Sequence, residues 1–389
     1  MTTILFIEIS YLLSKMNHDL KFKSINVSAT ELRCSHSLIN GQCFHWKKIH
    51  LTDIRNSTCW IGLIDQFVYI LKELENDTEY SVLNADNSSS INATNVLYNY
   101  LNISAKNNQP SNTKLLPDID ISVSTLLPEI SLTSLYPQWC HKDVHMTKAA
   151  AKCPGVRVFN QDVFECLISF ICSSNNNITR ITGMLDTFRR TYGTKLTRFQ
   201  NQDYHQFPTL EELISNPNFT IEALTKLGFG YRAKYVYNTV YKLKLLGGIS
   251  YLKDLQLSAK FLNTSQVLAK LQQFEGVGPK VANCVALSSL QRYDAVPMDV
   301  HMIKIVKTHY NNDVLAFEKL FQQYAGWAQL ILFTSQVFST KPTSNKAFKL
   351  QKVKQPANKE NAIKKRKYKE LLDTLNDEQF QYLFGVSKK

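Results

Sequence analysis

No two of the eight cysteines in this sequence are spaced as a CxxC pair. Zinc fingers, zinc ribbons and iron–sulfur clusters hold their metals with closely spaced cysteines, so none of these sites is predicted. Cys166 and Cys172 lie in an apolar run, where a cysteine is typically a small buried hydrophobic residue. We therefore expect reduced thiols in an intracellular protein, and no metal held by its side chains.

The sequence also lacks an apolar run of transmembrane length, so no membrane-spanning segment is predicted. The stretch from Ile4 to Leu13 resembles the apolar part of a signal peptide, but Glu8 interrupts it. No basic segment precedes this stretch, and it has no arginine of the kind found in mitochondrial presequences. We interpret residues 1–15 as an N-terminal extension, either a strand or a segment ahead of a second start at Met16.

Positive charge is abundant and unevenly distributed. The net charge of +13 and the isoelectric point near 9.2 favour a polyanionic partner, either nucleic acid or an anionic membrane surface. Residues 341–389 hold 13 Lys and Arg against 5 Asp and Glu, which leaves +5 for the rest of the chain. These residues are expected to form a flexible, mostly disordered basic tail. Its cluster Lys364–Lys367 suits nuclear import, and a solvated charged segment explains it equally well.

The first part of the chain, residues 16–154, is predicted to form an antiparallel β domain. Two runs of strand-forming residues, 59–64 and 67–71, flank the polar pair Asp65-Gln66, which is the pattern of a β-hairpin. A stretch rich in Asn and Ser near 84–130 is interpreted as a partly disordered insertion. Within it, residues 96–101 also suit a turn of helix.

The pattern becomes helical over residues 155–340. Val163–Cys172 is apolar on nearly all sides, as expected of a central buried helix. The polar residues 173–177 end it and can cap a second helix that begins at Ile178. The fold class is therefore α+β: an N-terminal antiparallel sheet domain, an all-α domain and the basic tail.

Gly276 and Gly278 separate two of the expected helices. Glycine allows positive φ and a close approach of the backbone, and the N-terminus of a helix attracts an anion. Such a helical hairpin suits a DNA phosphate. A bare Gly-x-Gly is a weak motif, however, and it also joins helices that touch no nucleic acid.

Lys280 lies in the first turn of the second helix, where the helix dipole disfavours a cation. This position favours a neutral amine, which can attack the anomeric carbon of a deoxyribose, expel the base and form a Schiff base. Contact with a phosphate explains the lysine equally well. Asp299 precedes another apolar helical run, so it can be a plain N-cap, a carboxylate that stabilises oxocarbenium charge, or both.

Six segments together point to one family. They are residues 274–284 and 297–301, which carry Lys280 and Asp299, with NGQCFHW at 40–46, the segment 164–180, GFGYRA at 228–233 and YAGWAQ at 324–329. The chain resembles the helix-hairpin-helix, Gly/Pro…Asp superfamily of DNA glycosylases. Within that superfamily it is similar to the eukaryotic-type 8-oxoguanine DNA glycosylase/AP lyases. The similarity covers roughly residues 16–83 and 131–340.

The resemblance implies a role for each matching residue. Lys280 would be the Schiff-base nucleophile and Asp299 the essential carboxylate. Gly41 would accept the N7–H that 8-oxoguanine has and guanine lacks, so that guanine would present a second acceptor to its carbonyl. The other matches form a base pocket, in which Cys284 and Phe333 would sandwich the flipped base and Gln329 would read its Watson–Crick edge. They also form a DNA-binding set, in which Asn175, Arg180 and Arg232 would hold the orphaned cytosine and Tyr231 would fill the vacated stack. Phosphates would be contacted by Gly276, Gly278 and His301.

Four positions depart from the family's pattern. His45 stands where an arginine is usual, and we expect it to loosen the loop that positions Gly41. Ser288 replaces a methionine of the base pocket, Asn283 an aspartate and Val163 a proline. These changes leave the lesion spectrum open, but they do not touch the lyase chemistry.

The resemblance implies a bifunctional DNA glycosylase and AP lyase of base excision repair. It would act as a monomer on double-stranded DNA, not at a membrane, and remove 8-oxoguanine, and formamidopyrimidine-guanine, opposite cytosine. No cofactor is expected, apart from a cation that the carbonyls of the hairpin can coordinate loosely. The nucleus is the expected compartment, with mitochondrial delivery also open.

Three other functions are disfavoured by the sequence. An endonuclease III-like glycosylase for oxidised pyrimidines is disfavoured because no four-cysteine cluster motif exists and because the β segment 40–83 is present. A glycosylase for alkylated bases is disfavoured by Lys280, since its monofunctional members need no such lysine. A non-catalytic damage-binding protein is disfavoured because both Lys280 and Asp299 are present.

Overall fold

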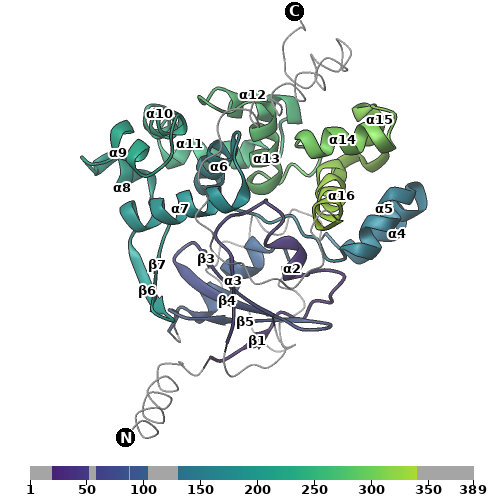
Figure 1. Ribbon diagram of the computed structural model, residues 1–389, viewed down its shortest axis with the longest axis horizontal. Coiled ribbons are helices and arrows are strands. Elements are labelled where there is room, and N and C mark those ends of the chain that lie inside the picture. Colours follow the sequence, from purple (N-terminus) through teal and green to yellow (C-terminus); the bar gives the residue numbers. More distant parts are fainter. Residues whose placement is uncertain (1–19, 52–57, 87, 104–129, 340–389) are drawn as a thin grey trace, which may run out of the picture.

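The computed structural model describes residues 20–51, 58–86, 88–103 and 130–339. A five-stranded antiparallel sheet in the order β1-β5-β4-β3-β2 forms the lower layer in Figure 1. Its strands are β1 (Lys23–Ser24), β2 (Lys47–Ile49), β3 (Thr58–Ile64), β4 (Phe67–Glu73) and β5 (Thr78–Val82). The predicted hairpin is confirmed, because Ile64 pairs with Phe67 and Asp65 turns the chain with a φ of 54°.

Two helices accompany this sheet, α2 (Cys34–Ser37) and α3 (Ser90–Tyr100). Helix α3 arises from the Asn- and Ser-rich stretch because Ala93, Leu97, Tyr98 and Tyr100 share a buried face. The suggested helical turn at 96–101 is therefore the end of a longer helix. Residues 104–129, the rest of the predicted insertion, lie outside the described residues, as do the N-terminal extension and the basic tail.

The helical layer is built around α6 (Val163–Ser173), which is buried along most of its length, as predicted. Asn177 caps α7 (Ile178–Tyr192) by accepting from the Arg180 N–H. A small hairpin, β6 (Lys195–Phe199) and β7 (Gln202–His205), follows α7. The remaining helices are α8 (Leu210–Ser215), α9 (Ile221–Lys226), α10 (Arg232–Leu245), α11 (Ile249–Ser258), α12 (Thr264–Gln272), α13 (Pro279–Ser289), α14 (Val300–His309), α15 (Val314–Phe321) and α16 (Ala325–Ser339), with a 3₁₀ turn at Gln322–Tyr324.

Two helices that precede residue 154 pack with the helical layer. They are α4 (Leu132–Lys142) and α5 (Val144–Lys152), and α5 lies against α16. Leu132, Trp139 and Met146 are buried in the same core as α6. The predicted boundary at residue 154 thus divides the sequence, whereas these two helices belong to the helical layer in packing.

Buried polar side chains join the sheet region to the helical layer. Arg157 donates to the backbone oxygens of Leu101, Asn102 and Ile130, and to Glu31 Oε2 at 2.8 Å. Glu31 in turn accepts from the first N–H groups of α4. The α+β class is confirmed. Over the described residues, no helix has both the length and the apolar character needed to cross a bilayer.

Candidate active site

Lys280 is the second residue of α13, after Gly278 as N-cap and Pro279 at the first helical position. Proline is favoured there because its missing N–H would be unpaired in any case. Helix α13 packs along α6 (Figure 1), and the Lys280 amine meets two α6 side chains. Its Nζ lies 3.5 Å from Ser173 Oγ and 5.3 Å from the centre of the Phe170 ring. A half-buried amine is therefore held over an aromatic face at the start of a helix.

Cys284 and Asp299 lie near this amine. Burial raises the pKa of the Cys284 thiol, the charge of Lys280 lowers that pKa and the charge of Asp299 raises it. Since both charges act on one thiol, the structure brings together the three residues that the sequence pattern selected. Asp299 caps α14 through Oδ1, which accepts from the N–H groups of His301 at 3.0 Å and Met302 at 2.8 Å. The predicted N-cap is confirmed, and it fixes the orientation of the carboxylate.

The two glycines of the hairpin between α12 and α13 have different constraints. Gly276 has a φ of +82°, and a Cβ there would lie 2.5 Å from the Tyr235 ring of α10. Gly278 has a φ of −85° and lies exposed, with open space where a Cβ would be. Buried Val277 anchors the turn by donating to the Phe274 carbonyl at 3.1 Å. Gly276 is thus required by the fold, whereas Gly278 presents backbone to solvent.

Besides Cys284 of α13, the predicted base-recognition residues come from the Gly41 loop and from α16, which touch each other. Asn40 Nδ2 donates to Thr334 Oγ1 of α16 at 3.2 Å, which places Gly41 beside that helix. Phe333, next to Thr334, is half-buried and makes an edge contact with the His301 ring at 5.9 Å. Gln329 lies one turn earlier on α16 and is buried. Within the described part of the chain its side-chain amide makes no hydrogen bond, so it is available to a ligand.

The predicted cytosine-binding residues surround the turn between α6 and α7. Asn175, with a φ of 46°, and Arg180 are exposed there, and Arg180 Nη2 donates to the Gly228 carbonyl at 3.3 Å. Tyr231 is 51% exposed, and its hydroxyl donates to the Ser174 carbonyl at 3.0 Å. These positions fit side chains that meet DNA.

Arg232 differs from its neighbours. It is only 2% exposed, and its guanidinium donates to the backbone oxygens of Ser174, Asn175 and Phe229. Its side chain is therefore not an ordinary surface charge. In this structure Arg232 holds the turn that presents Asn175.

The loop around Gly41 is held by side chains to which the sequence assigned no role. Gln42 donates to the carbonyls of Ser37 and Arg157 at 2.9 and 2.8 Å, and its Oε1 accepts from the Phe159 N–H at 3.0 Å. Its own carbonyl accepts from Gln161 Nε2 at 2.6 Å. A buried Gln with every polar group paired is a rigid support. Segment 40–46 contains Gln42, but its four partners, Ser37, Arg157, Phe159 and Gln161, lie outside this segment.

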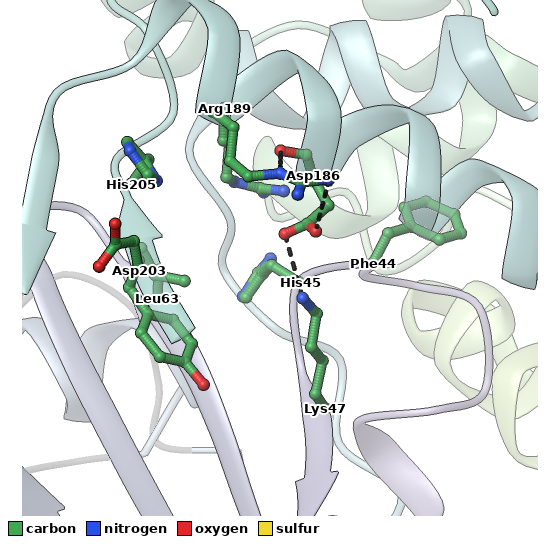
Figure 2. Close-up of a pocket in the computed structure, with 10 residues that line it drawn as sticks. Phe44, His45, Lys47, Leu63, Asp186, Arg189, Asp203 and His205 are labelled. Carbon is green, nitrogen blue, oxygen red and sulfur yellow. Dashed lines mark hydrogen bonds and ion pairs between the residues drawn. The ribbon is translucent and has the colours of Figure 1, made fainter. Parts of the chain in front are cut away.

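The contacts of His45 do not support the expectation that it loosens this loop. His45 is buried, with Nδ1 3.3 Å from Glu165 Oε1 and Nε2 3.1 Å from the Tyr100 hydroxyl. Figure 2 shows the pocket beside it, where His45 lies near Asp186 and Arg189 of α7 and Lys47 pairs with Asp186 at 3.1 Å. Neither Lys280 nor Asp299 lines this pocket. Around the catalytic candidates, as elsewhere among the described residues, no three His, Cys, Asp or Glu side chains gather as metal ligands.

Two family models match successive parts of the chain. Residues 24–167 match the model of the 8-oxoguanine DNA glycosylase N-terminal domain, and residues 168–328 match that of the HhH-GPD superfamily base excision DNA repair proteins. The N-glycosylase/DNA lyase OGG1 of Arabidopsis thaliana is 32% identical over 355 residues, which cover 87% of this chain and 85% of the relative. The N-glycosylase/DNA lyase of Saccharomyces cerevisiae is 30% identical over 360 residues, 82% and 87% of the two chains.

The fold has solved counterparts. A crystal structure of Clostridium acetobutylicum 8-oxoguanine glycosylase/lyase, bound to double-stranded DNA with cytosine opposite 8-oxoguanine, matches with a TM-score of 0.63. Its sequence is 23% identical, and the match covers 83% of this chain and 99% of that one. The 3-methyladenine DNA glycosylase of Archaeoglobus fulgidus matches with a TM-score of 0.54 at 12% identity, covering 82% of this chain and 98% of its own. At these identities the likeness concerns the fold.

Proposed function

Since the chain belongs to the 8-oxoguanine N-glycosylase/DNA lyases of the HhH-GPD superfamily, we propose that it removes 8-oxoguanine from double-stranded DNA and cleaves the resulting abasic site. The observation that carries this proposal is the grouping of Lys280, Asp299 and Cys284 where the glycine hairpin meets α13. A damage-binding protein would need the hairpin, but it would not need an amine and a carboxylate beside the base pocket.

Lys280 is the nucleophile in this proposal. Its neutral amine attacks C1′ of the flipped nucleotide, and the C1′–N9 bond breaks so that the base leaves with the bonding electrons and takes up a proton. The attacking nitrogen gives up one proton, the C1′–O4′ bond then breaks as the ring oxygen takes up a proton, and a protonated Schiff base forms. Removal of a C2′ proton then expels the 3′ phosphate by β-elimination. Phe170 and Ser173 hold the amine in place for the first of these steps.

Asp299 supplies negative charge to the same step. Both of its cap bonds end on Oδ1, which leaves Oδ2 for the positive charge that develops on the sugar. Because the cap bonds hold the carboxylate in one orientation, it does not have to reorient during the reaction. A carboxylate in this position stabilises an oxocarbenium-like sugar and assists loss of a proton from the lysine.

Base selection belongs to the neighbouring elements. The Gly41 carbonyl accepts the N7–H of 8-oxoguanine, and the Gln329 amide, which makes no hydrogen bond to the described residues, reads the Watson–Crick edge. Cys284 and Phe333 enclose the flipped base between α13 and α16. Asn175, Arg180 and Tyr231 lie on the exposed turns that would face the vacated stack, and the hairpin and His301 would face phosphates.

Excision of defined lesions tests the proposal. Single-turnover rates are measured on duplexes that carry 8-oxoguanine opposite each of the four bases, and on duplexes with oxidised pyrimidines. We expect the fastest excision opposite cytosine, and loss of excision and strand cleavage in Asp299→Asn. Excision of oxidised pyrimidines alone would support an endonuclease III-like enzyme. Binding to 8-oxoguanine without cleavage would support a damage-binding protein.

The remaining expectations concern the cofactor, the oligomeric state and the compartment. The described side chains supply an amine, a carboxylate and hydrogen-bond donors, and this chemistry calls for no cofactor. We propose a monomer that works in the nucleus, with Lys364–Lys367 as the import signal. Replacing these four basic residues by alanine in a fluorescent fusion should abolish nuclear accumulation. Unchanged accumulation would refute that assignment.

A further inference from the structure

His45 lies at the centre of a buried chain of polar groups. Trp46 Nε1 donates to the Tyr100 hydroxyl at 3.1 Å, and that hydroxyl lies 3.1 Å from His45 Nε2. The other ring nitrogen, Nδ1, faces Glu165 Oε1 at 3.3 Å, and because an ionised carboxylate can only accept, Nδ1 carries the imidazole proton. In the neutral ring Nε2 is then the acceptor, and the Tyr100 hydroxyl donates to it. Each polar atom of the imidazole therefore has a partner.

Glu165 closes the chain at its other end. Its Oε1 also pairs with the Arg189 guanidinium from α7, and both side chains are largely buried. Burial would raise the pKa of Glu165, but the charge of Arg189 and the hydrogen bond of His45 lower it to about 2. The carboxylate is thus ionised throughout the neutral range, and it is a constant acceptor for the His45 N–H.

The chain of groups ends on the helix that carries the Lys280 contacts. Glu165 lies in the first turn of α6, whereas Phe170 and Ser173, which meet the Lys280 amine, lie toward its end. Phe44, the neighbour of His45, packs edge-on against the same Phe170 at 5.8 Å between ring centres. Contacts with the single helix α6 therefore fix both the loop that carries Gly41 and the amine of Lys280.

We propose that His45 is a positioning residue, which Tyr100 of α3 and Glu165 of α6 lock in place so that the Gly41 carbonyl and the Lys280 amine keep a fixed separation. Tyr100 comes from the Asn- and Ser-rich segment 84–103, so this segment serves base recognition through His45. The proposal rests on the function proposed above. It predicts that damage to the lock impairs selection and excision of the base, but spares cleavage of a sugar that has already lost its base.

Two activities of the full-length protein separate these roles. One is the single-turnover rate of 8-oxoguanine excision opposite cytosine, and the other is strand cleavage at a preformed abasic site opposite cytosine. We expect His45→Ala to slow excision about tenfold or more, because small displacements of a positioning group are costly. Abasic-site cleavage should stay within about twofold of wild type, since α6 and Lys280 are intact.

Conservative variants guard against misfolding. His45→Asn keeps an amide N–H near the Nδ1 position, and Tyr100→Phe removes only the hydroxyl while keeping the ring stacked on Phe159. Both should slow excision less than His45→Ala does, again without loss of abasic-site cleavage. Asp186→Asn is the matched control, because it breaks an ion pair in the same pocket but does not touch His45. This control should leave both rates unchanged.

The outcomes separate the inference from the function beneath it. Equal slowing of excision and abasic-site cleavage in the His45 and Tyr100 variants would show a merely structural role and overturn the inference. Unchanged excision in His45→Ala would also overturn it. Failure of the wild-type protein to excise 8-oxoguanine would refute the proposed function itself, independently of any variant.

Discussion

Arg232 and Arg180 belong to the same predicted DNA-binding set, but the fold gives them opposite environments. Arg232 is buried and pairs with three backbone carbonyls, whereas Arg180 is exposed and makes one longer contact. Arg232→Met should therefore lower the free energy of unfolding by about 1–3 kcal/mol, because buried carbonyls lose their donors. Chemical denaturation measures this change.

Arg180→Ala is the matched control for that experiment. We expect its unfolding free energy to stay within about 0.5 kcal/mol of wild type, since surface substitutions seldom change stability by more. Its affinity for duplex DNA should fall and depend less steeply on salt. Equal stability of the two variants would show that the Arg232 contacts do not hold the turn.

At this scale, local residue types predicted some roles and missed others. The N-caps Asp299 and Asn177 were predictable because a cap depends on the residue and the few that follow it. The burial of Arg232 was not, because two of its acceptors, Ser174 and Asn175, lie far away in the sequence. The same holds for His45, whose substitution for arginine suggested a looser loop.

At the scale of elements, the two glycines of the hairpin between α12 and α13 should differ in how well they tolerate a side chain. Gly276→Ala should destabilise the protein by more than about 1 kcal/mol, because its φ is +82° and the new methyl would meet the Tyr235 ring at 2.5 Å. Gly278→Ala should cost less, about 0.5 kcal/mol, since alanine is a poorer N-cap than glycine but the extended backbone and open surroundings add no strain. Thermal unfolding of both variants compares them.

The DNA affinity of the Gly278 variant tests whether the hairpin binds DNA. We expect Gly278→Ala to weaken DNA affinity while the fold stays intact, because a methyl group would stand where a phosphate approaches the backbone. Unaltered affinity in this folded variant would show that the hairpin does not contact DNA.

Elements with strong periodicity were predictable, and irregular ones were not. Helix α6 and the β3–β4 hairpin show their patterns over seven or more residues. The β6–β7 hairpin went unpredicted because Gln200 and Asn201 make its turn with φ values of 46° and 61°, and no glycine signals it. Helix α3 was underestimated because its asparagines face solvent while a few apolar residues supply the buried side.

For the whole molecule, the joint between the sheet region and the helical layer decides the geometry of the site. Gln42, His45 and Arg157 each bond to groups from other segments of the chain. Such long-range pairing has no local signature, so the sequence predicted both layers and selected the candidate catalytic residues, but it did not show how the layers are joined.

This joint should make stability depend on pH. Burial lowers the pKa of His45, so the unfolded chain takes up a proton near pH 6.5 while the folded protein does not. Stability present above pH 6.5 is then lost as the pH falls below that value. Glu165, with its pKa lowered to about 2, does not titrate in this window.

Urea denaturation at pH 7.5 and 5.5 checks this prediction. The free energy of unfolding should drop between the two pH values, and His45→Asn should reduce the drop because it removes the titrating group. Other histidines, such as His309 with its lowered pKa, contribute equally to both proteins and cancel in the comparison. An identical drop in both proteins would show that His45 does not contribute.

The central claim is that Lys280 forms the covalent bond with the DNA sugar. Borohydride reduction during the reaction of the full-length protein with an 8-oxoguanine:cytosine duplex traps that bond, and peptide mapping of the trapped complex locates it. The account predicts an adduct on the peptide that contains Lys280, and none with Lys280→Gln. A trapped complex linked through another lysine, or an undiminished one with Lys280→Gln, would contradict it.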